Sequence, residues 1–305
     1  MRLTQIRDFL AVVERGGIRA AARQLGVSQP TITKSVRGLE DELGVQLLGR
    51  NSRGVVLTAS GRAFFSHARA AHAELRKAEE EATEVGGAHT GSVAFGVGNL
   101  GIALIVPQAV ADFRRQFPRA HLRIVEGLAH LLLPSLRDET LDFVLGMRPA
   151  TGFEPSLRFR PLYRTELVVA ARKGHPLNRA RSLVDLATAD WLSTSTLGLP
   201  GGPFERLFTT SGLAPPRQLI QCDSYYAVAA LLAKTDMLGV IQRRTLQDPF
   251  ARRFLRELRI AEPIPTVTAG IFTRADTPLT QVGASMVKCA TAAARRLARG
   301  PAPST

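Results

Sequence analysis

The feature that most constrains the fold is an alanine-rich segment followed by a glycine, a serine and a second helical pattern. Residues 18–25 (IRAAARQL) predict a short helix, and Gly26 predicts the turn that ends it. Ser28 is a good N-cap for the next helix, and Pro30 is tolerated in its first turn. Because alanine lets two helices pack closely, this order of residues is typical of a helix-turn-helix unit.

The helix that follows Ser28 has an apolar and a polar face. Its apolar positions are spaced by four, three and four residues and predict one buried stripe: Ile32, Val36, Leu39 and Leu43. Its polar positions carry side chains suited to DNA bases and phosphates: Gln29, Thr31, Thr33, Lys34 and Arg37. Together with Ser28 and Pro30, these residues form the predicted DNA-binding surface. The alternative is a three-helix packing module whose polar face is only solvated.

A basic loop follows this helix. The segment Arg50-Asn51-Ser52-Arg53-Gly54 separates apolar residues 45–48 from apolar residues 55–57, and this order predicts the tip of a β-hairpin. Arg50 and Arg53 are suited to contact phosphates or a minor groove. We therefore predict that residues 1–58 form an N-terminal all-α winged helix-turn-helix domain.

A long helix without proline is predicted over residues 59–87. Its apolar positions step alternately by four and three residues, which is the seven-residue repeat of a coiled coil. These dimerisation positions are Phe64, Ala68, Ala71, Leu75, Ala78, Ala82 and Val85. The segment is therefore predicted to be a dimerising linker helix. The alternative is an amphipathic helix that packs on its own chain.

The first 58 residues resemble the DNA-binding domain of LysR-type transcriptional regulators. The resemblance rests on FLAVVERGG, AAARQLGVSQPTITKSVRGLEDELGVQLLGR and RGVVLTASGR, and it continues in outline to the C-terminus. It implies a dimer, assembling further into a tetramer, that binds an interrupted inverted repeat in double-stranded DNA. It also implies a small-molecule effector, with RNA polymerase as a further partner.

Residues 88–305 alternate strand and helix signals, which predicts an α/β effector-binding domain. The resemblance implies a two-lobed, periplasmic-binding-protein-like domain, with lobe I at about 91–161 and 266–305 and lobe II at about 162–265. The ligand of such a domain binds between the lobes, at the carboxyl ends of the strands.

The candidate effector-binding residues follow predicted strands. In lobe I they are Gly98, Asn99, Leu100, Gly101, Ile102, Gly127, Leu128, Met147 and Arg148. In lobe II they are Ser193, Thr194, Ser195, Thr196, Cys222, Asp223 and Ser224. Hydroxyl groups, backbone amides and one arginine suit a carboxylate, sulfonate or phosphate, so the expected effector is an organic acid or another anion.

A competing hypothesis comes from GVGNLG at residues 96–101, a G-x-G-x-x-G motif between a strand and a helix. Glu126, at the end of the next strand, would then bind ribose hydroxyls, although it lies farther along the chain than is usual. The chain would be an α/β oxidoreductase fused to a DNA-binding module. A third hypothesis is a DNA-architectural protein without an effector.

Composition excludes several other classes. Cys222 and Cys289 are the only cysteines among 305 residues, too few for a disulfide scaffold, and no C-x-x-C pair suggests zinc. The sequence has no G-x-S-x-G, H-E-x-x-H or Walker motif, so we expect no enzyme, cofactor or metal. With no signal peptide or membrane span, we expect a cytoplasmic bacterial protein associated with the nucleoid. The net charge of +14 fits a nucleic-acid partner but does not establish one.

Overall fold

A computed structural model describes residues 1–51, 54–85, 91–150, 152–193, 203–216 and 219–299. The chain forms two compact units, which divide near Gly86. We describe each unit by itself.

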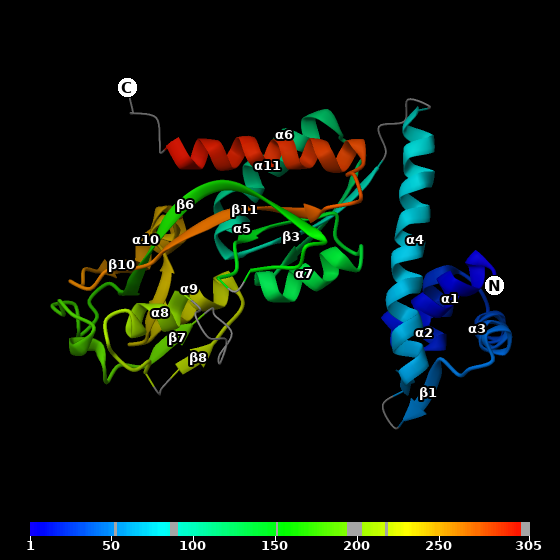
Figure 1. Ribbon diagram of the computed structural model, residues 1–305, viewed down its shortest axis with the longest axis horizontal. Helices are drawn as coiled ribbons and strands as arrows, with labels where there is room; N and C mark the ends of the chain where they lie inside the picture. The colour runs from blue at the N-terminus through cyan, green and yellow to red at the C-terminus, as the bar shows by residue number, and fades with distance from the viewer. Residues whose placement is uncertain (52–53, 86–90, 151, 194–202, 217–218, 300–305) are drawn as a thin grey trace. The chain divides into compact units, whose positions relative to one another are not determined.

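The N-terminal unit consists of helices and a small hairpin, which lies at one end of the unit (Figure 1). Its elements are α1 (Leu3–Glu14), α2 (Ile18–Leu25), α3 (Gln29–Leu43), β1 (Leu48–Asn51), β2 (Gly54–Leu57) and α4 (Ala59–Val85). Gly26 adopts a left-handed conformation (φ 66°) and ends α2, and Ser28 is the N-cap of α3. The strands β1 and β2 pair in antiparallel register from Leu48 opposite Leu57 to Asn51 opposite Gly54. The predicted winged helix-turn-helix fold is thus confirmed.

The core of the N-terminal unit explains why α2 carries small residues. Ala21 and Ala22 are buried, as close packing of α2 requires, and Phe9 and Ile32 are fully buried beside them. The predicted stripe of α3 is wrong at Leu43, which is 37% exposed. Leu43 lies in the last turn of α3, directly before Gly44 redirects the chain in a left-handed conformation.

The helix α4 packs into the core of its own unit near its start. Phe64 meets Phe9 edge-to-face at 5.5 Å, and Ala68 is buried in the same core. These first two positions of the predicted seam therefore pack within their own chain. Ala71, Leu75 and Ala78 are exposed on the following turns. The side chains of Ala82 and Val85 lie outside the described part of the structure.

The second unit is an α/β domain. Its strands are β3 (Ser92–Val97), β4 (His121–Glu126), β5 (Phe143–Met147), β6 (Leu157–Arg172), β7 (Trp191–Ser193), β8 (Leu219–Gln221), β9 (Leu238–Gln242), β10 (Leu255–Leu258) and β11 (Thr266–Arg274). Its α-helices are α5 (Asn99–Leu104), α6 (Val106–Gln116), α7 (Ala129–Arg137), α8 (Pro203–Thr209), α9 (Tyr225–Lys234), α10 (Pro249–Phe254) and α11 (Gln281–Arg299). Within the described ranges the sheet order is β4-β3-β5-β11-β6-β9-β7-β8, and β10 also pairs with β6.

Two long antiparallel strands, β6 and β11, run through both halves of this unit. Tyr163 and Ile271 belong to one hydrophobic core, whereas Leu167 and Val267, a few residues farther along the same two strands, belong to another. The unit therefore has two lobes, joined through this strand pair, and separate hydrophobic clusters form the core of each lobe. The pairing is irregular between Ala269 and Gly270, close to the change of core.

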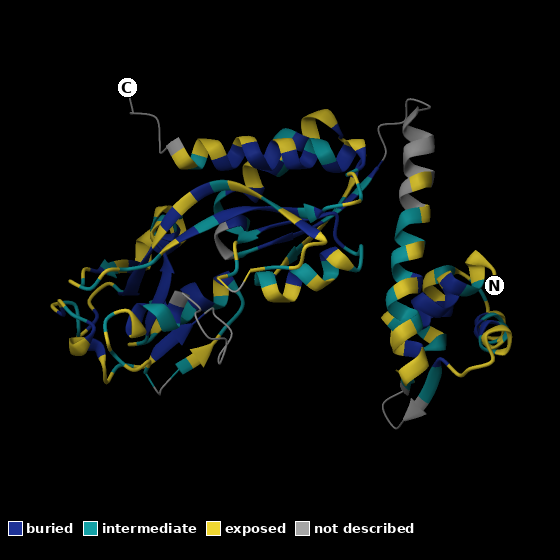
Figure 2. Ribbon diagram, viewed as in Figure 1, coloured by how far each residue is buried: buried dark blue, intermediate teal, exposed yellow. Residues whose placement is uncertain are grey.

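Helices cover both faces of the sheet in each lobe (Figure 1). In lobe I, α6 and α11 pack on one face through Phe113 and Met286, and α7 packs on the other through Leu132. In lobe II, α8 contributes Phe208 to one core, and α9 and α10 contribute to the other. Figure 2 shows the buried residues concentrated along the central strands. This layering leaves the ends of the strands as the place where loops and helix termini meet.

Candidate functional site

The polar face of α3 is open to solvent. Gln29, Pro30, Thr31, Lys34 and Arg37 are exposed, and Thr33 is half-buried. The Ser28 hydroxyl accepts from the Thr31 backbone N–H at 3.3 Å and lies 2.8 Å from the Thr31 hydroxyl. The Thr33 hydroxyl donates to the backbone carbonyl of Gln29 at 3.0 Å. These hydroxyl groups therefore shape the start of the helix, while the longer side chains extend from it.

The wing is tied to α3 by a glutamate that sequence reasoning missed. The Glu40 carboxylate accepts from the backbone N–H groups of Leu47 and Leu48, at 2.8 and 3.0 Å. Because both donors lie at the start of β1, Glu40 fixes the angle at which the hairpin leaves the helix. The predicted contacts at the tip cannot be placed, since Arg53 and the side chain of Arg50 lie outside the described residues.

In lobe I, three parallel strands end at one edge. Val97 at the end of β3 pairs with Glu126 of β4 and with Leu145 of β5. The Gly98 N–H donates to the Leu145 carbonyl at 2.8 Å, and the Gly127 N–H donates to the Val97 carbonyl at 3.1 Å. The structure thus brings these candidate cleft residues together: Gly98, Gly127, Leu128, Met147 and Arg148.

The glycines of GVGNLG mostly serve packing. A Cβ at Gly96 would lie 3.0 Å from Leu141, and one at Gly101 would lie 2.6 Å from Val97. A Cβ at Gly98 would make only ordinary contacts, with the nearest backbone atoms of Leu145 and Gly146 at 3.7 Å. Asn99 and Leu100 form the first turn of α5 together with Gly101 and Ile102, but the side chains of Asn99 and Leu100 are not described.

In lobe II, β7 and β8 run parallel and also end at one edge. Ser193 pairs with Gln221, and the Cys222 N–H donates to the Ser193 carbonyl at 3.0 Å. The Ser193 side chain is only 1% exposed, so it is not available to a ligand. Asp223 and Ser224 are half-buried and lead into α9. The remaining hydroxyl candidates, Thr194, Ser195 and Thr196, fall outside the described residues.

A hydrogen bond links the two edges. The backbone N–H of Tyr225, at the start of α9 in lobe II, donates to Glu126 Oε1 at the end of β4 in lobe I, at 2.7 Å. The end of β4 in lobe I and the start of α9 in lobe II are therefore in direct contact. In the competing dinucleotide hypothesis Glu126 would bind ribose, but here this oxygen accepts from the other lobe. No sequence signal connects two positions 99 residues apart in this way.

Met147 ends β5 and Arg148 follows it, and the two side chains lie in different surroundings. The Arg148 guanidinium stacks over Phe153 at 5.8 Å and over Phe159 at 5.9 Å, both from its own lobe. Such stacking on aromatic rings stabilises a cation without neutralising it. Met147 packs against the core of lobe II. Arg148 is exposed directly after β5.

The two cysteines differ in exposure. Cys289 is 6% exposed, and burial, with a smaller contribution from Asp112, raises the pKa of its thiol. Cys222 is partly exposed. The thiolate is the nucleophile in alkylation. We therefore expect iodoacetamide to alkylate Cys222 at least about tenfold faster than Cys289. Peptide mass spectrometry over a time course measures both rates in the native protein, and the unfolded chain serves as the control. Equal rates in the native protein would contradict this assignment.

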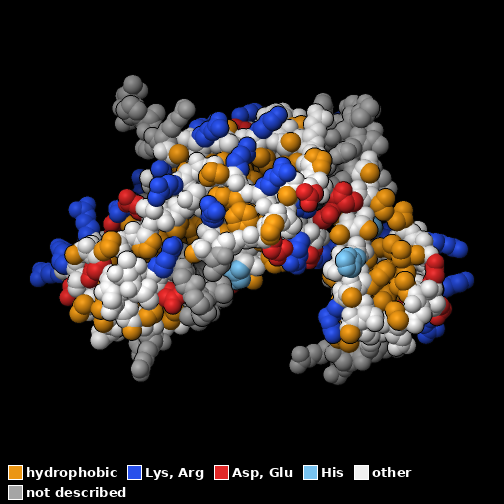
Figure 3. All heavy atoms as spheres, in the orientation of Figure 1, with side chains coloured by type: hydrophobic (Ala, Val, Ile, Leu, Met, Phe, Trp, Pro, Cys, Tyr) orange, Lys and Arg blue, Asp and Glu red, His pale blue; other side chains and the backbone are white. Residues whose placement is uncertain are grey.

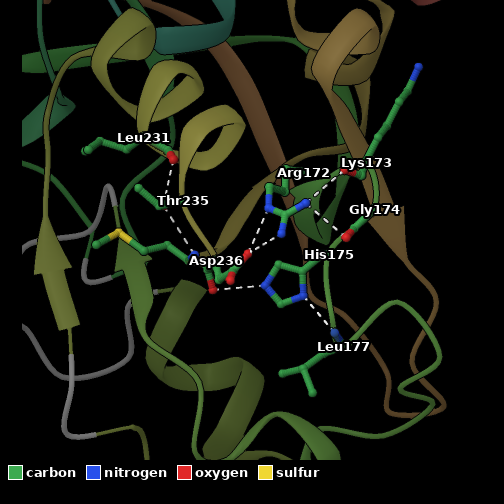
Figure 4. A network of polar contacts seen from close by, with 9 residues as sticks. Arg172, Lys173, Gly174, His175, Leu177, Leu231, Thr235 and Asp236 are labelled. Atoms are coloured by element: carbon green, nitrogen blue, oxygen red, sulfur yellow. Dashed lines mark hydrogen bonds and ion pairs between the residues drawn. The ribbon is translucent and has the colours of Figure 1, made fainter.

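His175 is a structural residue. It is 2% exposed, and its Nδ1 accepts from the Leu177 N–H at 3.0 Å (Figure 4). Its Nε2 then carries the proton and donates to the Asp236 carbonyl at 2.9 Å. Among the described residues, no group of three or more His, Cys, Asp or Glu side chains is arranged to hold a metal ion.

Positive charge does not single out one surface. Lys and Arg side chains lie on both units and are spread over much of the visible face of the second (Figure 3). The net charge of +14 therefore reflects the whole molecule. The geometry of α3 and of the cleft, rather than total charge, defines the two candidate sites.

Comparison with known proteins decides the family. The description "Bacterial regulatory helix-turn-helix protein, lysR family" matches residues 3–62, and "LysR substrate binding domain" matches residues 86–295. The chain belongs to the LysR family. This LysR-type protein is a DNA-binding transcriptional regulator with an effector-binding domain, which confirms the function predicted from the first 58 residues.

Relatives of known role support the same conclusion. The regulator GbpR of Azospirillum brasilense is 29% identical over all of this chain and 91% of its own length. The SDS degradation transcriptional activation protein of a Pseudomonas species is 32% identical, with 78% of each chain covered. Both relatives are named as regulators of transcription.

Solved structures agree in fold. The crystal structure of CbnR, a LysR family transcriptional regulator, aligns with a TM-score of 0.69 at 21% identity and covers 97% of this chain and 100% of CbnR. CbnR complexed with its target DNA aligns with a TM-score of 0.67 at 22% identity and covers 96% of this chain and 100% of CbnR. At this identity the similarity concerns the fold alone. In the described part of the LysR-type chain, no helix is both long and apolar enough to span a bilayer.

Proposed function

We propose that this LysR-type regulator binds an interrupted inverted repeat through α3 and the wing, and that a small anionic effector in the inter-lobe cleft controls it. The observation that carries the proposal is the hydrogen bond from Tyr225 to Glu126, which brings the end of β4 in lobe I into contact with the start of α9 in lobe II. A ligand that contacts both edges changes how the lobes close. In a dimer, such a change alters the spacing of the two DNA-binding units.

The proposed DNA contacts divide into two kinds. Lys34 and Arg37 extend from the exposed face of α3 and are placed to read base edges, together with Gln29 and Thr31. Ser28, Pro30 and Thr33 belong to the same end of the helix and set its backbone. Arg50 and Arg53 of the wing are assigned to phosphates or a minor groove.

This division predicts two kinds of mutant. We expect Arg53→Ala to weaken binding to all sequences and to reduce the slope of log K against log salt by about one. Lys34→Ala should mainly relax sequence preference, by about 1–3 kcal/mol at one base pair. Fluorescence anisotropy with specific and random duplexes over a salt series measures both effects. Lys173→Ala, an exposed lysine of lobe II, is the control. An unchanged salt slope in Arg53→Ala would remove the wing from the DNA contact.

Self-association is proposed through the exposed part of α4, from Ala71 through Leu75 to Ala78, continuing to Ala82 and Val85. A dimer places two recognition helices at a fixed spacing, which an inverted repeat requires. Further association into a tetramer pairs two such units on longer DNA. RNA polymerase is the proposed partner for transcription control, and the bacterial cytoplasm at the nucleoid is the proposed location.

The proposed effector is an organic acid or another small anion. Backbone N–H groups at the start of α5 and α9 and the charge of Arg148 favour an anionic ligand over a neutral one. The proposed contacts are Gly98, Asn99, Leu100, Gly101, Ile102, Gly127, Leu128, Met147 and Arg148 in lobe I, and Thr194, Ser195, Thr196, Cys222, Asp223 and Ser224 in lobe II. Ser193 is left out because its side chain is buried.

We further propose that the protein is not an enzyme. Gly96 and Gly101 have packing reasons to be glycine, and Glu126 bonds to lobe II, so the dinucleotide hypothesis loses the features that suggested it. Thermal melting with NAD(H) and with aromatic and aliphatic acids distinguishes an effector-binding regulator from an oxidoreductase, because a true ligand raises the melting temperature by mass action. Saturable stabilisation by NAD alone would favour the oxidoreductase.

The experiment that tests the whole proposal is a gel-shift scan of the DNA flanking the protein's own gene. We expect one segment to be retained at nanomolar protein, and its footprint to change when an acid that stabilises the protein is added. Retention of all segments with equal affinity would indicate an architectural DNA-binding protein instead.

A further inference from the structure

The helix α9 lacks a cap from its own lobe. Ser224 occupies its N-cap position, but the hydroxyl of Ser224 makes no capping bond. In α3 and α10 a local side chain supplies the cap, since Ser28 accepts from Thr31 and Asp248 accepts from Ala251 at 2.9 Å. The helices α2, α5 and α6, like α9, have no such side-chain cap. The first N–H groups of a helix need an acceptor from outside the helix. In α9 the acceptor for Tyr225 comes from the other lobe.

Glu126 supplies this acceptor with a carboxylate. Its Oε1 lies 2.7 Å from the Tyr225 nitrogen, within the short range of charge-assisted hydrogen bonds. The N-terminus of a helix carries a partial positive charge, so a carboxylate is favoured there over a neutral acceptor. The Glu126 side chain is also exposed, and solvent therefore screens the interaction. A bond of this kind is strong enough to bias an arrangement and weak enough to exchange with another anion.

Each partner is held firmly within its own lobe. Glu126 lies on β4, where it pairs with Val97 of β3. The network of Figure 4 fixes the far end of α9. In it the Thr235 hydroxyl donates to the Leu231 carbonyl at 2.7 Å, and Arg172 Nε donates to the Asp236 carboxylate at 2.8 Å. The buried face of α9 also packs into lobe II through Val228 and Leu232. The bond can therefore break only when the lobes move relative to each other or when the Glu126 side chain swings out.

We propose that Glu126 is an inter-lobe latch: its carboxylate occupies the N-terminus of α9 as a tethered anion and competes there with the anionic effector. The competition rests on the proposed function, whereas the latch does not. An effector carboxylate that reaches α9 must replace Glu126, and the lobes then lose this contact between β4 and α9. Glu126 would thus set both the resting lobe arrangement and the effector concentration needed to change it.

Hydrogen exchange of the Tyr225 amide tests the latch directly. This N–H belongs to the first turn of α9 and has Glu126 as its acceptor, so its protection reports the bond. We expect exchange in full-length Glu126→Ala to be about tenfold faster than in the wild type, and exchange in Glu126→Gln to be intermediate because the amide oxygen still accepts. Peptides from β3 and β5 should exchange as in the wild type, which shows that lobe I remains folded.

Glu154→Gln is the matched control. It makes the same chemical change in lobe I, but the Glu154 carboxylate pairs with Arg137 of its own lobe at 3.1 Å. Exchange at Tyr225 should therefore not change in this variant. Wild-type exchange of Tyr225 in Glu126→Ala would overturn the latch. Equal acceleration in Glu154→Gln would also overturn it, because the effect would then reflect lobe I charge in general.

Melting with acetate, succinate, benzoate, sulfate and phosphate tests the competition. For an anion that stabilises the wild type, Glu126→Ala should lower the half-saturating concentration by about fivefold or more. An unchanged half-saturating concentration would refute the competition between Glu126 and the effector. The hydrogen-exchange experiment would then decide alone whether the latch exists. If no anion stabilises either protein, the proposed anionic effector is wrong, and the exchange experiment still decides the latch.

Discussion

Replacing Gly61 by alanine should disable the DNA-binding unit of this regulator. We expect Gly61→Ala to cost about 3 kcal/mol of stability in this unit, at the upper end of the usual cost of overpacking. Operator affinity should fall at least about tenfold, although residue 61 does not belong to the proposed DNA surface. The reason lies in how α4 begins.

The first turn of α4 rests directly on the chain that enters the wing. The Thr58 N–H donates to the Leu47 carbonyl at 3.0 Å, and the Thr58 hydroxyl accepts from the Gly61 N–H at 2.9 Å. A Cβ at Gly61 would overlap the Leu47 carbonyl oxygen and lie 3.1 Å from Leu57. The obstacle is backbone, which cannot rotate away. Leu47 itself is buried and held by Glu40 of α3, so α3, the wing and α4 would all have to shift.

Ser60→Ala is the matched control, since Ser60 is exposed on the same turn and alanine favours the helix. Thermal melting and exchange of residues 44–66 in the full-length protein measure the effect on stability, and anisotropy measures the effect on DNA binding. If Gly61→Ala melted and bound like Ser60→Ala, the described contact between α4 and Leu47 would be wrong.

Sequence reasoning succeeded where the determining interactions are local. Ser28 caps a helix three residues away, Gly26 needs only its own left-handed conformation, and Ala21 packs against a neighbouring helix. Such signals lie within a few residues of one another and can be read in one pass. The β1–β2 hairpin could be predicted for the same reason, because the residues of its tip lie next to the strands that they join.

Sequence reasoning failed where the residue that a side chain contacts is distant in the sequence. Phe64 and Ala68 fit a coiled-coil repeat, yet Phe64 packs on Phe9, because an apolar position does not state which surface it will meet. Ser193 looked like a ligand hydroxyl, but its strand buries it. Glu126 was predicted to bind ribose because it follows the GVGNLG motif. Its observed partner is the Tyr225 N–H at the start of a helix in the other lobe. These outcomes depend on the three-dimensional arrangement of the strands.

The exposed part of the α4 seam leads to the second large effect. We expect Leu75→Glu to weaken self-association by about a hundredfold or more, because two carboxylates would be forced together in apolar surroundings without partners. Leu75 is 41% exposed on its own chain, so the monomer fold should tolerate the change. Operator affinity should fall with the dimer, since an inverted repeat is bound tightly only when both recognition helices are linked.

Two controls separate charge at the interface from other effects. Leu75→Ala removes apolar area without adding charge and should weaken the dimer less. Ala73→Glu adds the same charge about 200° around the helix and should leave association unchanged. Sedimentation velocity over a concentration series measures each equilibrium. An unaltered dimer with normal operator binding in Leu75→Glu would mean that α4 pairs through another face. The exposed seam from Ala71 to Ala78 would then need a different partner, since three exposed apolar positions in register remain unexplained by the folded monomer.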